Sequence, residues 1–252
     1  MAPSIHNTGV PLPKPPPKAH AVRAKPDFTG IIFHVLSAAV MANGFVALLQ
    51  LGMTDWINGQ VGGHFQFLTI DGLWLTIITC LLGGLSEMIP GVPLLKSIKR
   101  AFLLIALPVE LTISTISWGL ILLAPGLIVP DMADINKDTS GPVTSSSSAP
   151  QLLRIPTWID VCIHGVPAVV LVIDFFVREK KYRPPVSTWG AIVLSAIAGS
   201  AYTVWVEYCA SYNQRFPYPF LPSDSFGARI VIYIGATGFA YLAFKFLNGL
   251  HA

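Results

Sequence analysis

Six long apolar runs, separated by polar segments, dominate the pattern of the chain. Each run holds about 20 residues, the length that a helix needs to cross a bilayer. A segment in lipid must satisfy its own backbone hydrogen bonds, so the runs predict helices, and the short alternating segments of a barrel do not occur. We therefore predict an all-α, polytopic membrane bundle of six transmembrane helices over Thr29–Gly52, Phe67–Ile89, Ala101–Leu123, Trp158–Val177, Ser187–Cys209 and Ala228–Leu247.

Three polar stretches flank or interrupt these runs. Residues 1–28 are rich in proline, with four Lys or Arg and one acid. This composition favours an extended, solvated tail, and such a tail could dock a proline-reading partner. Residues 130–157 contain four consecutive serines and predict a flexible outer loop, and residues 248–252 form a short C-terminal tail. The membrane domain is therefore expected over residues 29–247.

Composition supports a membrane protein and excludes several other classes. Of the 252 residues, 53% are hydrophobic and 12% are charged, and the mean hydropathy is +0.62. Soluble domains carry about 25% charged residues, so about half of the usual water-facing charge is missing. The net charge of +3 forms no basic stripe for binding nucleic acid. The three cysteines all lie in apolar runs, and no disulfide framework can be read from them.

The distribution of Lys and Arg predicts the orientation of the bundle. The tail, the connectors 90–100 and 178–185, and Lys245 together hold 12 of the 16 basic residues, and six spans place all of them on one side. Because basic residues are enriched on the cytoplasmic side, both termini are expected in the cytoplasm. We expect an endomembrane location, with the endoplasmic reticulum first, or the plasma membrane.

Ionisable residues inside the spans are candidates for function because burying a charge in lipid is expensive. Those near span ends, where water or headgroups can solvate them, are Asp174, Glu87, Asp160 and Glu207. The deepest acid is Glu110, which could simply bond a neighbouring helix. Together with Asp71 and Glu207 it could instead line the path of a small transporter or channel. The remaining candidates are His34 and His164.

His164, Asp160 and Thr69 are the side chains most suited to nucleophilic chemistry. His164 is the seventh residue of its span, about 9 Å below the outer boundary, and Asp160 lies one helical turn earlier on the same face. Asp160 could therefore orient the imidazole, or it could only cap the start of a helix. Thr69, the third residue of the second span, falls in the same leaflet. A hydroxyl and an imidazole at one depth can form a nucleophile–base pair, although either side chain could serve only an interhelical hydrogen bond.

No spacing of residues in the chain predicts a metal or a cofactor. The sequence has no zinc spacing, histidine box, phosphate loop or Gly-x-Ser-x-Gly motif, and its six histidines are scattered. Gly62-Gly63 predicts a turn rather than a dinucleotide site. We therefore expect no cofactor and no metal.

Five blocks, in order, resemble the androgen-induced and androgen-dependent family of membrane proteins. The first, Gly62-Gly63-His64-Phe65-Gln66-Phe67-Leu68-Thr69, is similar to the Gly-Gly-x-x-x-(Phe/Tyr)-Leu-Thr block of that family. The others are Leu107-Pro108-Val109, Ile155-Pro156-Thr157-Trp158-Ile159-Asp160 with Ile163-His164, Tyr218-Pro219-Phe220-Leu221, and Gly227-Ala228-Arg229-Ile230. The similarity covers roughly residues 29–247.

Members of this family are threonine hydrolases that act on fatty acid esters of hydroxy fatty acids. The resemblance implies a lipid-ester substrate in the bilayer, with Thr69 as the nucleophile and His164 as its base. It also suggests Arg229 for the free carboxylate of the substrate, although an interfacial anchor would explain this residue as well. Vertebrate members often have asparagine at the position of Asp160, and the tail and the Ser-rich loop fit a fungal-type branch. A lipid-binding or scaffold protein without catalysis is the remaining alternative.

Overall fold

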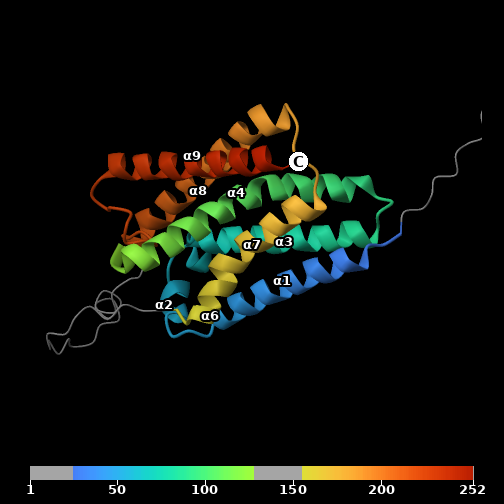
Figure 1. Cartoon of the computed structure of the whole chain (residues 1–252). Coiled ribbons are helices and arrows are strands. Elements are labelled where there is room, and N and C mark those ends of the chain that lie inside the picture. The colour runs from blue at the N-terminus through green and yellow to red at the C-terminus, as the bar shows by residue number, and fades with distance from the viewer. Residues whose placement is uncertain (1–24, 128–154, 252) are drawn as a thin grey trace, which may run out of the picture.

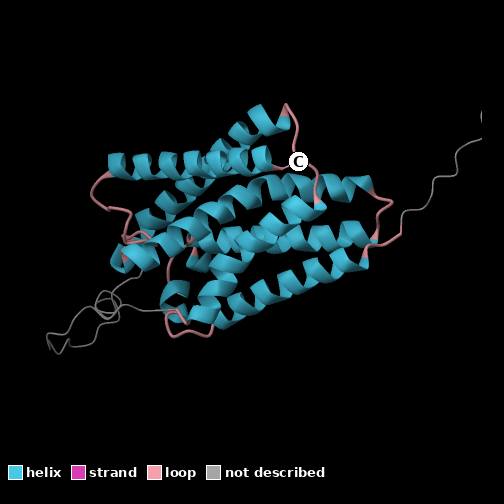
Figure 2. Cartoon of the chain, in the orientation of Figure 1, coloured by secondary structure: helices cyan, strands magenta, loops and turns pink. Residues whose placement is uncertain are grey.

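The computed structural model describes residues 25–127 and 155–251 of the chain. Within these ranges the protein is built from helices and loops, without strands (Figures 1 and 2). Most of the predicted proline tail and Ser-rich loop lies outside the described residues.

Six helices are long and apolar enough to cross a membrane, which confirms the predicted all-α, six-span architecture. Four are single helices, and the fifth span is a helix that follows a short π-helical turn. The fourth span is composite, with α-helical segments α6 and α7 each followed by a π-helical turn. The spans are α1 (Phe28–Leu48), α3 (Leu68–Met88), α4 (Pro93–Leu123), Thr157–Arg178, Val186–Asn213 and α9 (Phe226–Leu250). The segments of the fourth and fifth spans are α6 (Thr157–Asp160), η3 (Val161–Gly165), α7 (Val166–Ile173), η4 (Asp174–Arg178), η5 (Val186–Gly190) and α8 (Ala191–Asn213).

Short helices occupy two of the connections. Between α1 and α3 lie α2 (Thr54–Asn58) and the 3-10 helix η1 (Gly63–Gln66), and the 3-10 helix η2 (Pro125–Leu127) follows α4. Figure 1 shows α2 and α6 at one end of the bundle and the described ends of the chain at the other. The two described ends therefore lie at the same end of the bundle, as an even number of spans requires. Their cytoplasmic location stays a prediction.

The third span begins at Pro93, eight residues before the expected start at Ala101. Proline suits the first turn of a helix because that turn has no backbone acceptor for its N–H. The charged segment predicted as a connector therefore continues the helix, and Lys99 turns inward and is only 2% exposed. The charged residues did not mark where this helix begins, because the charge of Lys99 is neutralised by carboxylates inside the protein.

The first four spans form the densely packed part of the bundle, and α8 and α9 pack on α4 (Figure 1). Close approach depends on glycine at several contacts, two of which involve Gly44 and Gly72. A Cβ atom at Gly44 of α1 would lie 2.5 Å from the Cβ atom of Cys162 in η3, and one at Gly72 of α3 would lie 2.6 Å from Glu110 Oε1 in α4. These glycines bring α1 against the turn that carries His164, and α3 against α4.

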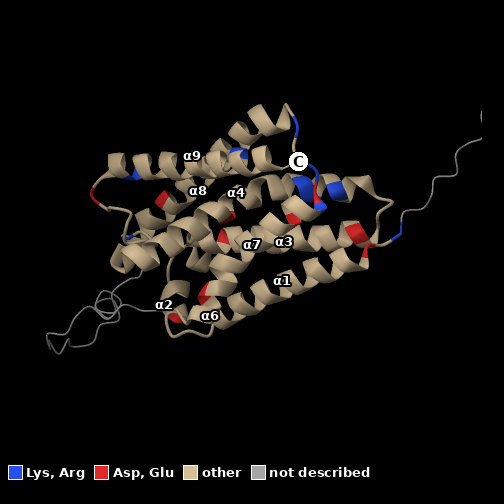
Figure 3. Cartoon of the chain, viewed as in Figure 1, with Lys and Arg blue, Asp and Glu red and all other residues tan. Residues whose placement is uncertain are grey.

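Charged residues of several helices gather at the end of the bundle where the described ends of the chain lie (Figure 3), and they form a buried ion-pair network. Lys99 Nζ is 2.6 Å from Asp174 Oδ2 and 2.6 Å from Glu179 Oε1. The His34 ring lies between Asp174, at 3.2 Å, and Glu87, at 3.0 Å. Asp174 is 1% exposed, so the expectation that solvent surrounds it is wrong. A carboxylate near a span end can be buried when cations from neighbouring helices reach it.

Candidate active site

His164 lies in the π-helical turn η3, where the regular helix of the fourth span is interrupted. Pro167 follows closely and has no N–H to donate to the carbonyl of Ile163, so the local α-helical pattern cannot continue. The Val166 N–H bonds the carbonyl of Val161 instead, which closes one wide turn. Single π-turns inside helices recur at functional sites. Here the turn carries an imidazole that is 8% exposed.

Thr69 meets this imidazole from the neighbouring helix. It is the second residue of α3, its side chain is buried, and its Oγ1 lies 3.3 Å from His164 Nε2. The two groups that the sequence placed in one leaflet are therefore in contact. The distance is at the long end of the hydrogen-bond range, as is common for nucleophile–base pairs before a substrate binds.

Asp160 binds the opposite side of the same ring. Its Oδ1 lies 2.7 Å from His164 Nδ1, and both side chains are largely shielded from solvent. A carboxylate at this position accepts the proton of Nδ1, so Nε2 is left with a free lone pair. That lone pair faces the Thr69 hydroxyl, which can donate to it. The three side chains thus form a hydroxyl–imidazole–carboxylate line with the proton positions that nucleophilic catalysis requires.

The loop before α3 is fixed by side chains of α8. Asn213 bonds both the N–H and the carbonyl of Val61, at 2.8 and 3.0 Å, and Trp205 Nε1 donates to the Phe65 carbonyl at 2.7 Å. Gly62 adopts a φ of +88°, a left-handed conformation that glycine alone adopts without strain. A Cβ atom there would also lie 2.7 Å from Cys209 Sγ. The predicted Gly-Gly turn is therefore a rigid support for the start of α3.

Two tyrosines complete the surroundings of Thr69, and sequence reasoning gave them no role. The Tyr202 hydroxyl donates to the Gln66 carbonyl, at 3.1 Å, and accepts from the Leu68 N–H, at 3.3 Å. The Tyr218 hydroxyl contacts the hydroxyl and the backbone N–H of Thr69. Burial raises the pKa of Tyr218, which keeps the phenol protonated and able to donate. Its place in a block shared with the family was the signal that could have singled it out.

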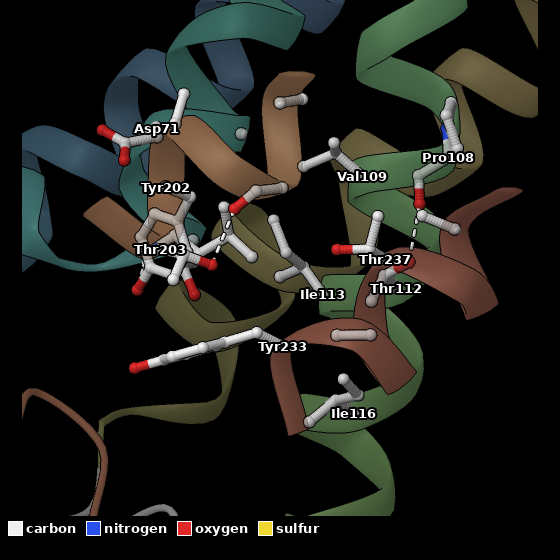
Figure 4. A pocket seen from close by; sticks show the side chains of 18 of the residues that line it. Asp71, Pro108, Val109, Thr112, Ile113, Ile116, Tyr202, Thr203, Tyr233 and Thr237 are labelled. Carbon is white, nitrogen blue, oxygen red and sulfur yellow. Dashed lines mark hydrogen bonds between the residues drawn. The ribbon is translucent and has the colours of Figure 1, made fainter. Parts of the chain in front are cut away.

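A cavity of about 560 Å³ opens beside Thr69, between α3, α4, α8 and α9. Its volume falls within the range of about 300–1,000 Å³ that is typical of ligand sites. Figure 4 shows Asp71, Tyr202 and Tyr233 among the polar side chains around it, and Pro108, Ile113 and Ile116 among the apolar ones. Thr69 lines the cavity, whereas His164 does not.

Arg229 is engaged by partners of its own. Its guanidinium forms two bonds with Glu207, at 2.7 and 2.9 Å, and donates to the carbonyls of Pro222 and Ser223, at 2.7 and 3.2 Å. Every guanidinium nitrogen is therefore engaged. Binding of a substrate carboxylate, the role predicted for Arg229, would require Glu207 to move, and that role stays a prediction.

The acids that a transporter would use have separate surroundings. Glu110 is fully buried against α3, where the Thr76 hydroxyl donates to it at 3.3 Å. Glu207 pairs with Arg229 and accepts from the Tyr233 hydroxyl at 2.9 Å, and Asp71 lines the cavity. Within residues 25–127 and 155–251, no group of three or more His, Cys, Asp or Glu side chains is arranged to hold a metal ion.

The fold and this site define a polytopic helical membrane protein with a polar constellation at the edge of an apolar cavity. The chain belongs to the family described as FAR-17a/AIG1-like protein, which matches residues 29–252. The chain is also 25% identical, over 232 residues, to a UPF0641 membrane protein of Schizosaccharomyces pombe. The aligned region covers 89% of this chain and 91% of that relative. No solved structure matches the chain. The family predicted from the sequence blocks is confirmed, and one relative is fungal.

Proposed function

We propose that the protein is a membrane-embedded lipid-ester hydrolase in which Thr69 is the nucleophile and His164 the base. The observation that carries this proposal is the line of contacts from Thr69 Oγ1 through the His164 ring to Asp160, next to a cavity that can hold a lipid chain. A hydroxyl next to an oriented imidazole is the arrangement that activates a weak nucleophile.

The proposed reaction has two stages. His164 Nε2 takes the proton of the Thr69 hydroxyl while Oγ1 bonds the ester carbonyl carbon, and the ester C–O bond then breaks as the imidazolium protonates the departing alcohol. Water next attacks the acyl-threonine, again with its proton passing to His164. The carboxylic acid leaves, and Thr69 Oγ1 recovers a proton from the ring. Asp160 stabilises the imidazolium in both stages.

The Tyr218 hydroxyl lies next to Thr69, where negative charge develops on the carbonyl oxygen of the ester. The Thr69 N–H belongs to the first turn of α3, where no intrahelical acceptor exists, and it interacts with this same hydroxyl. We assign the Tyr218 O–H to the oxyanion of the proposed reaction, because a donor fixed before reaction stabilises such charge most effectively.

The proposed substrates are fatty acid esters of hydroxy fatty acids, which are apolar enough to reach the site from the bilayer. The proposed compartment is the endoplasmic reticulum, within an endomembrane or plasma-membrane location. A docking partner for the proline-rich tail remains part of the proposal, and no cofactor is invoked.

Membranes that contain the protein test the proposal through labelling by a fluorophosphonate probe and through hydrolysis of a fluorogenic lipid ester. We expect Thr69→Ala and His164→Ala to abolish both signals. The matched control is Thr79→Ala, which removes another buried threonine of α3 whose hydroxyl only bonds the Leu75 carbonyl. If the Thr69 and His164 variants label and hydrolyse like the parent protein, the proposed function is wrong.

A further inference from the structure

The two ends of the cavity differ, because hydroxyl groups gather at one end and mostly apolar side chains line the other. Consecutive spans run in opposite directions. Residues at the same depth in the bundle therefore come from opposite ends of helices that follow one another in the chain. Thr69 near the start of α3, Tyr202 in the second half of α8 and Tyr233 near the start of α9 line the polar end. Figure 4 shows Tyr202 and Tyr233 on the same side of the cavity as Asp71. Leu75, Leu104, Leu194 and Ala240 lie at the opposite end and form its floor.

The depth of the cavity matches one lipid chain. Its wall extends from Leu104 to Ser117 along α4 and from Leu194 to Trp205 along α8. At 1.5 Å per residue these stretches span about 20 and about 16 Å. A lipid chain in one leaflet occupies half of the hydrocarbon core of about 30 Å, which is about 15 Å. A single chain therefore fits lengthwise.

The floor is closed by packed side chains. Leu104 belongs to a buried cluster that also contains Phe244, and Leu75 and Leu194 pack against this cluster. Ala240 is 9% exposed. Because a packed interior does not yield to one more methylene without cost, the floor sets a limit on the chain that enters.

The positions of Thr69 and His164 decide which chain of the ester enters. Thr69 lines the cavity and His164 does not. The departing alcohol must take its proton from His164, so it leaves on the side of the imidazole. The acyl group remains bonded to Thr69 and faces the cavity.

We propose that this cavity holds the acyl chain of the ester and that its floor sets the longest acyl chain hydrolysed, while the alcohol chain stays outside. The inference rests on the proposed function and adds the specificity of the same site. Ala240 is the floor residue whose enlargement shortens the cavity most directly, since its side chain is the smallest there.

The test compares two series of fluorogenic esters in membranes containing the full chain. In one series the acyl chain lengthens in two-carbon steps, and in the other only the alcohol chain does. Ala240→Leu fills the floor and Leu194→Ala deepens it. Ala196→Leu is the matched control, because Ala196 lies on α8 two residues from the cavity-lining Ala198 and is exposed.

We expect Ala240→Leu to lower kcat/KM for the longest acyl chains about 15- to 60-fold relative to short ones, which is the burial free energy of the two to three methylenes that no longer fit. Leu194→Ala should move the optimum toward longer acyl chains, and Ala196→Leu should behave like the parent. Neither floor variant should change the alcohol-chain profile. Unchanged acyl profiles in both floor variants, or a shift in the alcohol series, would overturn the inference while the proposed function stands. If the Thr69→Ala variant still hydrolyses short esters at the parental rate, the proposed function is wrong instead.

Discussion

The bond between Asp160 and His164 is the part of the site whose contribution can be worked out in most detail. Its length of 2.7 Å and its burial identify a charge-assisted hydrogen bond. During the proposed reaction His164 becomes an imidazolium, and the Asp160 carboxylate then faces a full positive charge. The bond is therefore stronger in the transition state than before reaction, which is the condition for a contribution to rate.

Two substitutions separate charge from orientation. In Asp160→Asn the amide oxygen can still accept from Nδ1, so this variant removes the charge and keeps an acceptor in place. The difference between a charged and a neutral hydrogen bond is about 1–1.5 kcal/mol, which predicts a decrease in kcat/KM of about 5- to 13-fold. Asp160→Ala removes the whole bond, about 1.5–3 kcal/mol, and predicts a decrease of about 13- to 160-fold.

The assay is hydrolysis of a fluorogenic lipid ester by purified protein in detergent, with thermal unfolding measured on each variant to establish equal folding. Asp55→Asn is the control, because Asp55 is an exposed acid on α2, at the same end of the bundle. An Asp160→Ala protein that folds normally and hydrolyses at the parental rate would refute the orienting role.

Two further predictions concern Lys99, which stabilises the bundle, and Gly62, which positions the start of α3. Lys99→Ala should lower the free energy of unfolding by about 3–5 kcal/mol, because Asp174 is left buried without its cation. Thermal unfolding measures this, with Lys96→Ala, an exposed position on the same helix, as the control; equal midpoints would contradict the reasoning. Gly62→Ala should cost about 1–2 kcal/mol for the left-handed backbone alone, and more for the clash with Cys209, and should lower ester hydrolysis by displacing the start of α3. Parental activity and stability would contradict that role.

The apolar pattern was sufficient to predict the spans because lipid imposes one local rule on every span. A segment of about 20 apolar residues must be helical whatever its neighbours are. The rule fails where protein replaces lipid. Pro93 begins α4 earlier than predicted and Asp174 is buried, because Lys99 and its carboxylate partners neutralise one another across helices.

The candidate site could be predicted only in part, because its geometry also depends on contacts between helices. The position of Thr69 and His164 at one depth followed from span order and charge, and the spacing of Asp160 and His164 followed from helical periodicity. The distance between Thr69 and His164 did not follow, because it depends on which helices touch. The engagement of Arg229 by Glu207 also could not be read from the chain.

The sequence by itself thus determined the six helices, their alternation across the bilayer and the family, since each depends on local composition or on ordered blocks of residues. Only the tertiary structure decided the contact between Thr69 and His164, the cavity beside Thr69 and the contacts of Tyr202 and Tyr218. These features depend on lateral packing, where glycines such as Gly44 set how closely two helices approach. Lipid gives all outward apolar faces the same environment, so the apolar pattern of a span does not specify which neighbour it will contact.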